Sequence, residues 1–156
     1  MASEERNTAI YLSPGISVGY TFGQGFNWGG QISLGLVKLE EPLSVLSKIF
    51  FPVPSLSLGF RNSKRHKIKF IDFQVYTAEN GVINGGAGAG LAKITKKSSG
   101  YSQRYSHIKL YMGALPLAQL DFFFQLRSKS MITSLGATGV LPIPVYAISK
   151  ETTEDP

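Results

Sequence analysis

Apolar and polar residues alternate along most of this chain, and the alternation is clearest between Ile10 and Phe22. Apolar side chains occupy the even positions of this stretch, whereas serine, glycine and threonine occupy most of the odd positions. A period of two predicts a β-strand with one apolar face. At about thirteen residues the strand exceeds the roughly 5–6 residues of an ordinary strand, and it reaches the roughly 9–11 residues that cross a bilayer.

The same alternation recurs along the chain and predicts eight strands joined mostly by short turns. The predicted strands are Thr8–Phe22, Gly30–Leu39, Ser55–Arg61, Ile68–Thr77, Ile83–Ile94, Tyr105–Ala114, Ala118–Leu126 and Met131–Tyr146. We expect no helix long enough for a parallel crossover, so the strands should be antiparallel. Eight such strands close into an up-and-down β-barrel. The chain is therefore predicted to be a single all-β domain over residues 1–156, with the barrel at about 9–146 and a polar tail at 147–156.

Two stretches depart from the alternation. The glycine-rich segment Gly23–Gly30 is expected to form a turn or short loop that carries Phe26 and Trp28. In Glu40–Pro54 the apolar residues fall at helical spacing between prolines, which predicts a short helix or ordered connection near residues 42–51. That element could lie in a membrane interface or cap one end of the barrel.

The small polar faces of the strands are predicted to line the lumen, because they carry few charges and those charges are of both signs. In a narrow lumen Asp72 and Asp121 could pair with Lys109 and Arg61. The predicted lumen network is Asp72, Tyr76, His107, Lys109, Tyr111 and Asp121. A glycine stripe on the fifth strand would leave room for the bulky residues of the sixth.

The apolar faces would then point outward, and the barrel would be transmembrane. With 17 Gly, 10 Phe, 7 Tyr and 17% charged residues, the composition suits such a barrel. The predicted lipid-facing aromatic residues are Tyr20, Phe22, Phe60, Phe122 and Phe124. A soluble lipocalin-like barrel, in which the same aromatic residues would line a pocket for a hydrophobic ligand, is the alternative. The chain contains no run of about 18 apolar residues, which excludes a transmembrane helix.

The charged residues segregate by the predicted ends of the barrel, in a chain of net charge +6. Lys69 and Lys93 flank the connections at the basic end. The predicted basic rim comprises Arg61, Lys64, Arg65, Lys67, Lys96, Lys97, Arg104, Arg127 and Lys129. The predicted acidic rim comprises Glu4, Glu5, Glu40, Glu41, Glu79, Glu151, Glu154 and Asp155.

The segments PGISVGYTFGQGFNWG and INGGAGAGL, together with the repeated strand pattern over about residues 9–146, resemble the small eight-stranded outer-membrane β-barrel proteins of bacteria. This resemblance implies an outer-membrane location, with both termini and the acidic rim on the periplasmic side. The basic rim would face the phosphates of lipopolysaccharide. Residues 1–9 contain no apolar signal segment, so we expect the signal peptide to have been removed.

The sequence offers few candidate residues for catalysis, metal binding or nucleic acid binding. The chain has no cysteine and two histidines, so we expect no cofactor and no metal site. Ser106 and His107 are adjacent on a strand and must point to opposite faces, and His66 lies in a basic turn without a nearby acid. Only Tyr101 and Tyr105 interleave with the basic residues, so we expect no nucleic acid partner.

The function predicted from these patterns is non-enzymatic: a structural or adhesion role, or a subunit of an envelope complex with other envelope proteins as partners. A lipid-modifying enzyme is the further alternative, because the resemblance includes lipid A deacylases and palmitoyltransferases that use serine and histidine. Asp72 and Asp121 could also be interpreted as an acid-base pair, although a structural network is the favoured interpretation.

Overall fold

A computed structural model describes residues 7–39, 52–79, 82–113, 116–125 and 128–148 of the chain. The described part consists of strands and turns, and it contains no helix with the length and apolarity needed to cross a bilayer. The strands are β1 Asn7–Thr21, β2 Gly25–Leu39, β3 Pro52–Ser63, β4 His66–Glu79, β5 Val82–Lys96, β6 Ser102–Met112, β7 Leu117–Gln125, β8 Ser130–Val140 and β9 Ile143–Ile148. The element predicted near residues 42–51 lies outside the described residues.

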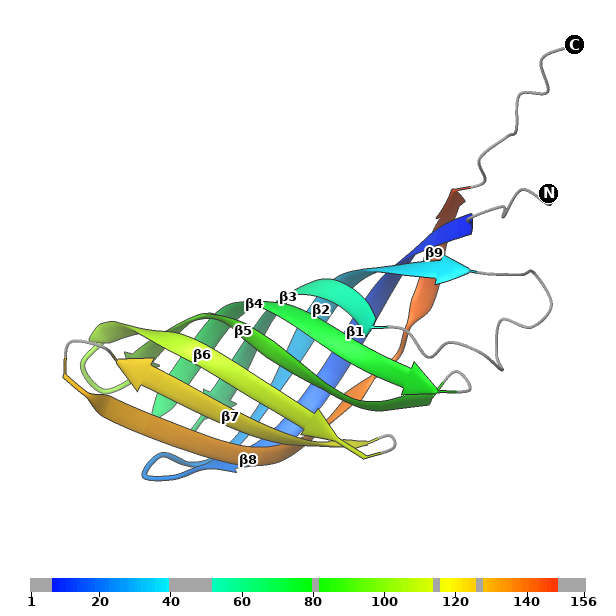
Figure 1. Cartoon of the computed structure of the whole chain (residues 1–156). Helices are drawn as coiled ribbons and strands as arrows, with labels where there is room; N and C mark the ends of the chain where they lie inside the picture. Colours follow the sequence, from blue (N-terminus) through cyan, green and yellow to red (C-terminus); the bar gives the residue numbers. More distant parts are fainter. Residues whose placement is uncertain (1–6, 40–51, 80–81, 114–115, 126–127, 149–156) are drawn as a thin grey trace, which may run out of the picture.

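Consecutive strands pair antiparallel from β1 to β8, and β1 also pairs with β8. The β1–β8 ladder joins Gly15–Thr21 to Ser134–Val140, which closes the barrel. Figure 1 shows the tilted strands wrapped around a single axis, with the start of β1 and the end of β9 at the same end of the barrel. The predicted eight-stranded antiparallel up-and-down barrel is therefore confirmed.

The last predicted strand, Met131–Tyr146, is wrong as one continuous element, because it is divided into β8 and β9. The break lies at Leu141 and Pro142, where the Leu141 amide donates to the carbonyl of Pro14 at 3.0 Å. Proline has no amide hydrogen to continue the ladder. The chain then pairs again with the first residues of β1 as β9, with a register shift between Ile10 and Tyr11.

The predicted loop Gly23–Gly30 is also wrong in extent, because β2 begins at Gly25. The turn is confined to the residues around Gly23, whose φ is 78°, and Gly25 has a φ of 89°. Glycine adopts this left-handed region without steric cost, so two glycines suffice to reverse the chain. Trp28 consequently lies on a strand and is 52% exposed.

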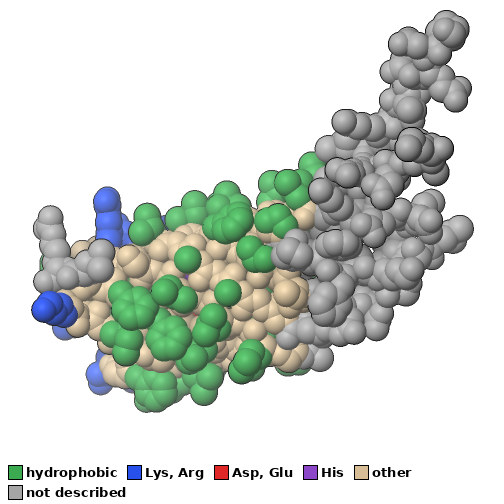
Figure 2. Space-filling view, viewed as in Figure 1, with side chains coloured by type: hydrophobic (Ala, Val, Ile, Leu, Met, Phe, Trp, Pro, Cys, Tyr) green, Lys and Arg blue, Asp and Glu red, His purple; other side chains and the backbone are tan. Residues whose placement is uncertain are grey.

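The two faces of each strand differ in character, as the alternation predicts. Large apolar side chains cover the outside: Ile16 is 77% exposed, Phe73 58% and Leu91 63%. Figure 2 shows such side chains distributed over the barrel wall, with Lys and Arg gathered at one end. The predicted outward aromatic residues include Tyr20 and Phe60, which are exposed. Phe122 and Phe124 are half-buried and stack on each other with ring centroids 6.2 Å apart.

Candidate functional site

The lumen is filled by inward side chains in three layers, whose order can be followed along β4. Ile68 and Phe70 belong to an apolar layer near the end that carries the turns after β3 and β5. Asp72 and Gln74 follow in a polar layer, and Tyr76 belongs to a second apolar layer at the other end. The first layer is Ile68, Phe70, Ala92, Ile94, Tyr105 and Phe123. The second is Tyr76, Tyr111, Leu117 and Val140.

The shortest ion pair in the polar layer crosses the lumen from β3 to β7. Arg61 donates from Nη1 to Oδ2 of Asp121 and from Nη2 to Oδ1, both at 2.7 Å. The two residues are 3% and 1% exposed. Two parallel charge-assisted hydrogen bonds fix the planar guanidinium against the carboxylate. Gln119 Nε2 also donates to Asp121 Oδ1 at 2.8 Å, so this carboxylate is held by Arg61 and Gln119 together.

His107 lies between the two carboxylates of the layer. Its Nδ1 is 2.8 Å from Oδ1 of Asp72, and its Nε2 is 3.0 Å from Oδ1 of Asp121. The ring stacks on Phe123, with centroids 4.5 Å apart and an interplanar angle of 5°. The two ring nitrogens of an imidazole point in different directions, so one histidine can contact a carboxylate on each side. His107 therefore links the two acids into one network.

Lys109 completes the network from β6. Its Nζ is 2.9 Å from Oδ2 of Asp72 and 3.9 Å from the ring centroid of Phe70. The lysine is 0% exposed, and a buried ammonium is tolerated only when it is paired. Carboxylate and aromatic ring together replace the water that this cation loses.

Of the six residues predicted for the lumen network, Asp72, His107, Lys109 and Asp121 form one connected cluster. Tyr76 and Tyr111 lie in the neighbouring layer, with ring centroids 5.3 Å apart. Tyr76 donates to Gln74 Oε1 and accepts from Gln31 Nε2 at 3.3 Å.

The structure corrects one predicted placement. Arg61 was expected at the basic rim as well as near the acids, but its side chain is buried in the lumen and belongs to the network. The reason is the parity of β3, on which residue 61 follows the inward positions of Ser57 and Gly59. Lys109 lies opposite Asp121 in the β6–β7 register, yet the described ion pair of Lys109 is with Asp72.

The predicted glycine stripe on β5 is confirmed by the register. Gly86, Gly88 and Gly90 lie opposite Tyr111, Lys109 and His107, respectively. A Cβ at residue 90 would come within 2.0 Å of the carbonyl oxygen of Ile71 and 2.6 Å of a carboxylate oxygen of Asp72. Larger residues at this position would therefore displace the network, so the glycine creates the space in which the charges meet.

Several buried polar residues of the lumen were not identified as part of the site from the sequence. The sequence feature that could have identified them is their parity, because each occupies an inward position in the alternation of its strand. These residues are Thr21, Gln31, Ser33, Ser57, Gln74, Gln119, Ser134 and Thr138.

The predicted basic rim is assembled at the end of the barrel that carries the turns after β3, β5 and β7. Lys97 joins two of these turns, because its Nζ donates to the carbonyl of Ser63 at 2.7 Å and its amide donates to that of Arg65 at 2.8 Å. The other predicted rim residues with exposed side chains at this end are Lys64, Arg65, Lys67, Lys96, Arg104 and Lys129. Arg127 and the side chains of the predicted acidic rim lie outside the described part.

His66 begins β4 at this basic end and is half-buried. Partial burial, together with the positive charges of Lys96 and Arg65, lowers the pKa of His66 below its ordinary value. Ser63 Oγ donates to the carbonyl of His66 at 3.1 Å and accepts from its amide at 2.9 Å, which fixes the short turn. Within the described residues, no cluster of His, Asp and Glu has the arrangement of a metal site.

Comparison with protein families, with curated proteins and with solved structures finds no match to this chain. The site must therefore be interpreted from its own geometry. That geometry is a lumen closed by two apolar layers around mutually paired charges, within a wall whose outer surface is apolar.

Proposed function

We propose that the protein is an integral membrane β-barrel with a side-chain-filled lumen, serving a structural or adhesion role or acting as a subunit of an envelope complex. The observation that carries this proposal is the inverted polarity of the wall. Ile16, Leu91 and Met112 on the outside are between 63% and 77% exposed, whereas Lys109 and Asp121 inside are 0% and 1% exposed. A lipid environment makes the exposed surface favourable, because apolar side chains then meet acyl chains instead of water.

The height of the apolar surface supports the same proposal. On β2 the outward positions are apolar from Phe26 to Leu36, with Gly30 as the one position that has no side chain. This run of about eleven residues matches the roughly 9–11 residues of a strand that crosses a bilayer. Trp28 and Phe60 pack edge to face, at 6.0 Å between ring centroids, near the basic end. Aromatic residues at such a position suit a membrane–water interface.

The bacterial outer membrane is the proposed location, because outer-membrane barrels have this inverted pattern of lipid-facing apolar and inward polar residues. The basic rim would then lie among headgroups, where cations are attracted to anionic phosphates. The partners in this proposal are the lipid bilayer, lipopolysaccharide phosphates at the rim and other envelope proteins.

The soluble barrel for a hydrophobic ligand is the weaker candidate, since such a pocket is lined mainly by apolar side chains. Here the middle of the lumen holds Arg61, Asp72, His107, Lys109 and Asp121. These charges contact one another, and the aromatic residues that would line the pocket are on the outside.

The lipid-modifying enzyme is also the weaker candidate. Ser106 is in register with Leu91 and Phe124 of the outer surface, whereas His107 lies in the lumen. A nucleophile and its base must come within hydrogen-bond reach, which opposite faces of one strand do not allow.

The test is the behaviour of the purified protein toward detergent and bilayers. We expect dispersion only in detergent, co-flotation with phosphatidylcholine vesicles after an alkaline carbonate wash, and faster gel migration before boiling than after it. A stable monomer in plain buffer that does not float with vesicles would contradict the proposal.

A further inference from the structure

Three cations lie side by side on the outer surface of the barrel, on three consecutive strands. Lys69 of β4 is in register with Lys93 of β5, and Lys93 is in register with Arg104 of β6. All three side chains are exposed. Directly opposed residues on antiparallel strands have Cβ atoms about 4.5–5.5 Å apart, so three positive charges share a surface about 10 Å wide.

This cation row lacks a carboxylate partner in the part of the chain that the structure describes. The carboxylates whose side chains are described, Asp72 and Asp121, are buried in the lumen on the other side of the wall. Like charges directly opposite one another destabilise a sheet. An external anion placed between the three cations would remove that repulsion.

The residues next to the cation row indicate what else a ligand at this site must carry besides negative charge. One register step toward the middle of the barrel, Leu58, Ile71 and Leu91 form an apolar row in register across β3, β4 and β5. Their exposed fractions are 53%, 43% and 63%. A ligand bound here therefore meets positive charge at one level and apolar side chains at the next.

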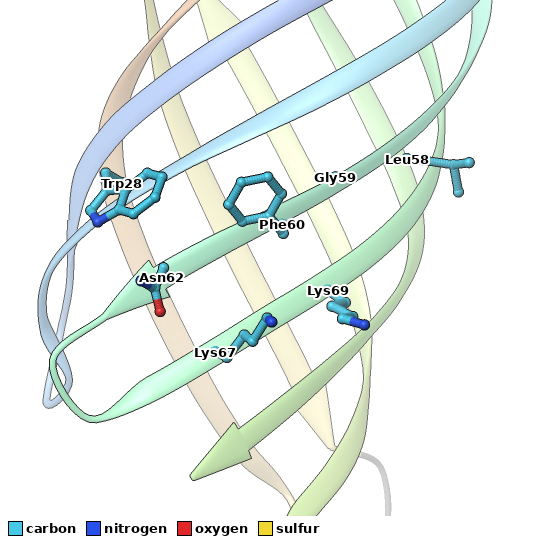
Figure 3. Close-up of a pocket in the computed structure, with 7 residues that line it drawn as sticks. All are labelled: Trp28, Leu58, Gly59, Phe60, Asn62, Lys67 and Lys69. Carbon is cyan, nitrogen blue, oxygen red and sulfur yellow. The ribbon is translucent and has the colours of Figure 1, made fainter. Parts of the chain in front are cut away.

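An open groove beside the cation row adds a surface for the headgroup. It has a volume of about 570 Å³, and its lining includes Trp28, Phe60, Lys67 and Lys69. Figure 3 shows the Trp28 and Phe60 side chains on β2 and β3, with those of Lys67 and Lys69 on the neighbouring strand. Aromatic rings next to lysines suit a polar headgroup that carries phosphate.

We propose that Lys69, Lys93 and Arg104 bind the phosphates of an anionic lipid whose acyl chains lie along the apolar row. This inference rests on the proposed membrane location. It differs from attraction of the charged turns to a headgroup layer, because the site is on the wall and includes an acyl-chain surface. A soluble polyanion would use the cations but would leave the apolar row without a role.

The experiment measures which lipids contact the reconstituted protein. The protein is placed in phosphatidylcholine bilayers that contain spin-labelled phosphatidic acid or spin-labelled phosphatidylcholine, and the association of each is measured by electron paramagnetic resonance. The wall variant is Lys69→Gln/Lys93→Gln/Arg104→Gln. The control variant, Lys64→Gln/Arg65→Gln/Lys129→Gln, removes the same charges from turns at the same end of the barrel.

We expect the native protein to associate more strongly with phosphatidic acid than with phosphatidylcholine. Each cation removed should lower this preference about fivefold, so the wall variant should lose most of it. The control variant should retain it. Equal losses in the two variants, or binding of soluble heparin without any preference for phosphatidic acid, would overturn the inference. If the protein incorporates into phosphatidylcholine without that preference, the inference alone fails. If it does not incorporate, the proposed membrane function fails as well.

Discussion

The cations inside the barrel and the cations on its outer wall lie on neighbouring strands, with both kinds present on β6, but they differ in burial and in pairing. Inside, Arg61 and Lys109 are almost fully buried, and each has a carboxylate within 2.9 Å or less. Outside, Lys69, Lys93 and Arg104 are exposed and lie next to one another. The comparison teaches that the inner charges are satisfied by the fold itself, whereas the outer charges are arranged for a partner that the fold does not supply.

The largest effect should follow from removing the carboxylate of the inner pair. We expect Asp121→Asn to lower the free energy of unfolding by about 3–5 kcal/mol, because Arg61 is left buried without its counter-charge. The measurement is denaturant unfolding in lipid vesicles, followed by the fluorescence of Trp28, the single tryptophan of the chain.

The double variant Arg61→Met/Asp121→Asn is the control for this prediction. Since it removes both charges, it should be more stable than Asp121→Asn alone. A double variant that loses the sum of the two single losses would show that the pair is not coupled.

A smaller effect should distinguish two lysines on opposite faces of the wall. Lys109→Met leaves the Asp72 carboxylate with His107 as its remaining side-chain partner among the described residues, and we expect a loss of about 1–3 kcal/mol. Lys69→Met changes an exposed residue and should alter the same free energy by no more than about 0.5 kcal/mol. The same unfolding assay measures both variants, and equal losses would remove the distinction between inner and outer cations.

The smallest effect concerns His66, at the boundary between the wall and the basic turns. Its pKa is lowered in the folded protein, so the folded state binds a proton less readily than the unfolded chain. The stability contributed by the neutral ring is therefore complete above the ordinary histidine pKa of about 6.5 and decreases as the pH falls below it.

We expect His66→Gln to lose less stability than the native protein between pH 7 and pH 5, as measured by the denaturant midpoint at the two pH values. His107 is present in both proteins, so the difference between them isolates His66. Identical pH dependence in the two proteins would contradict the assignment.

The barrel and the direction of its side chains could be predicted from the sequence, because a period of two determines both strand type and face. Two features were predicted incorrectly, although the same alternation would have placed them correctly. Asn27 is an inward residue between the outward Phe26 and Trp28, yet the glycines around them suggested a loop. Arg61 continues the inward parity of β3, yet the basic residues after it suggested a turn.

The partners within the lumen could not be predicted from the alternation. Arg61 and Asp121 belong to β3 and β7, which are not neighbours in the sheet, so their contact depends on barrel closure and on the reach of a long side chain. Lys109 lies opposite Asp121 in the ladder but extends to Asp72. Backbone register specifies where a side chain starts, and the available space in the lumen decides where its charged end lies.

The ladder between β1 and β8 has a consequence for the order of folding. It joins the first and last strands of the barrel wall, and the hydrogen bond from Thr138 to the carbonyl of Ile16 spans 122 positions of the chain. Contacts between distant residues form late, because the chain must first lose the entropy of a long loop. The Arg61–Asp121 pair spans 60 positions and crosses the same lumen. Curling of the sheet into a closed cylinder and pairing of its internal charges should therefore be one cooperative step, and an unclosed sheet would expose both faces of its wall.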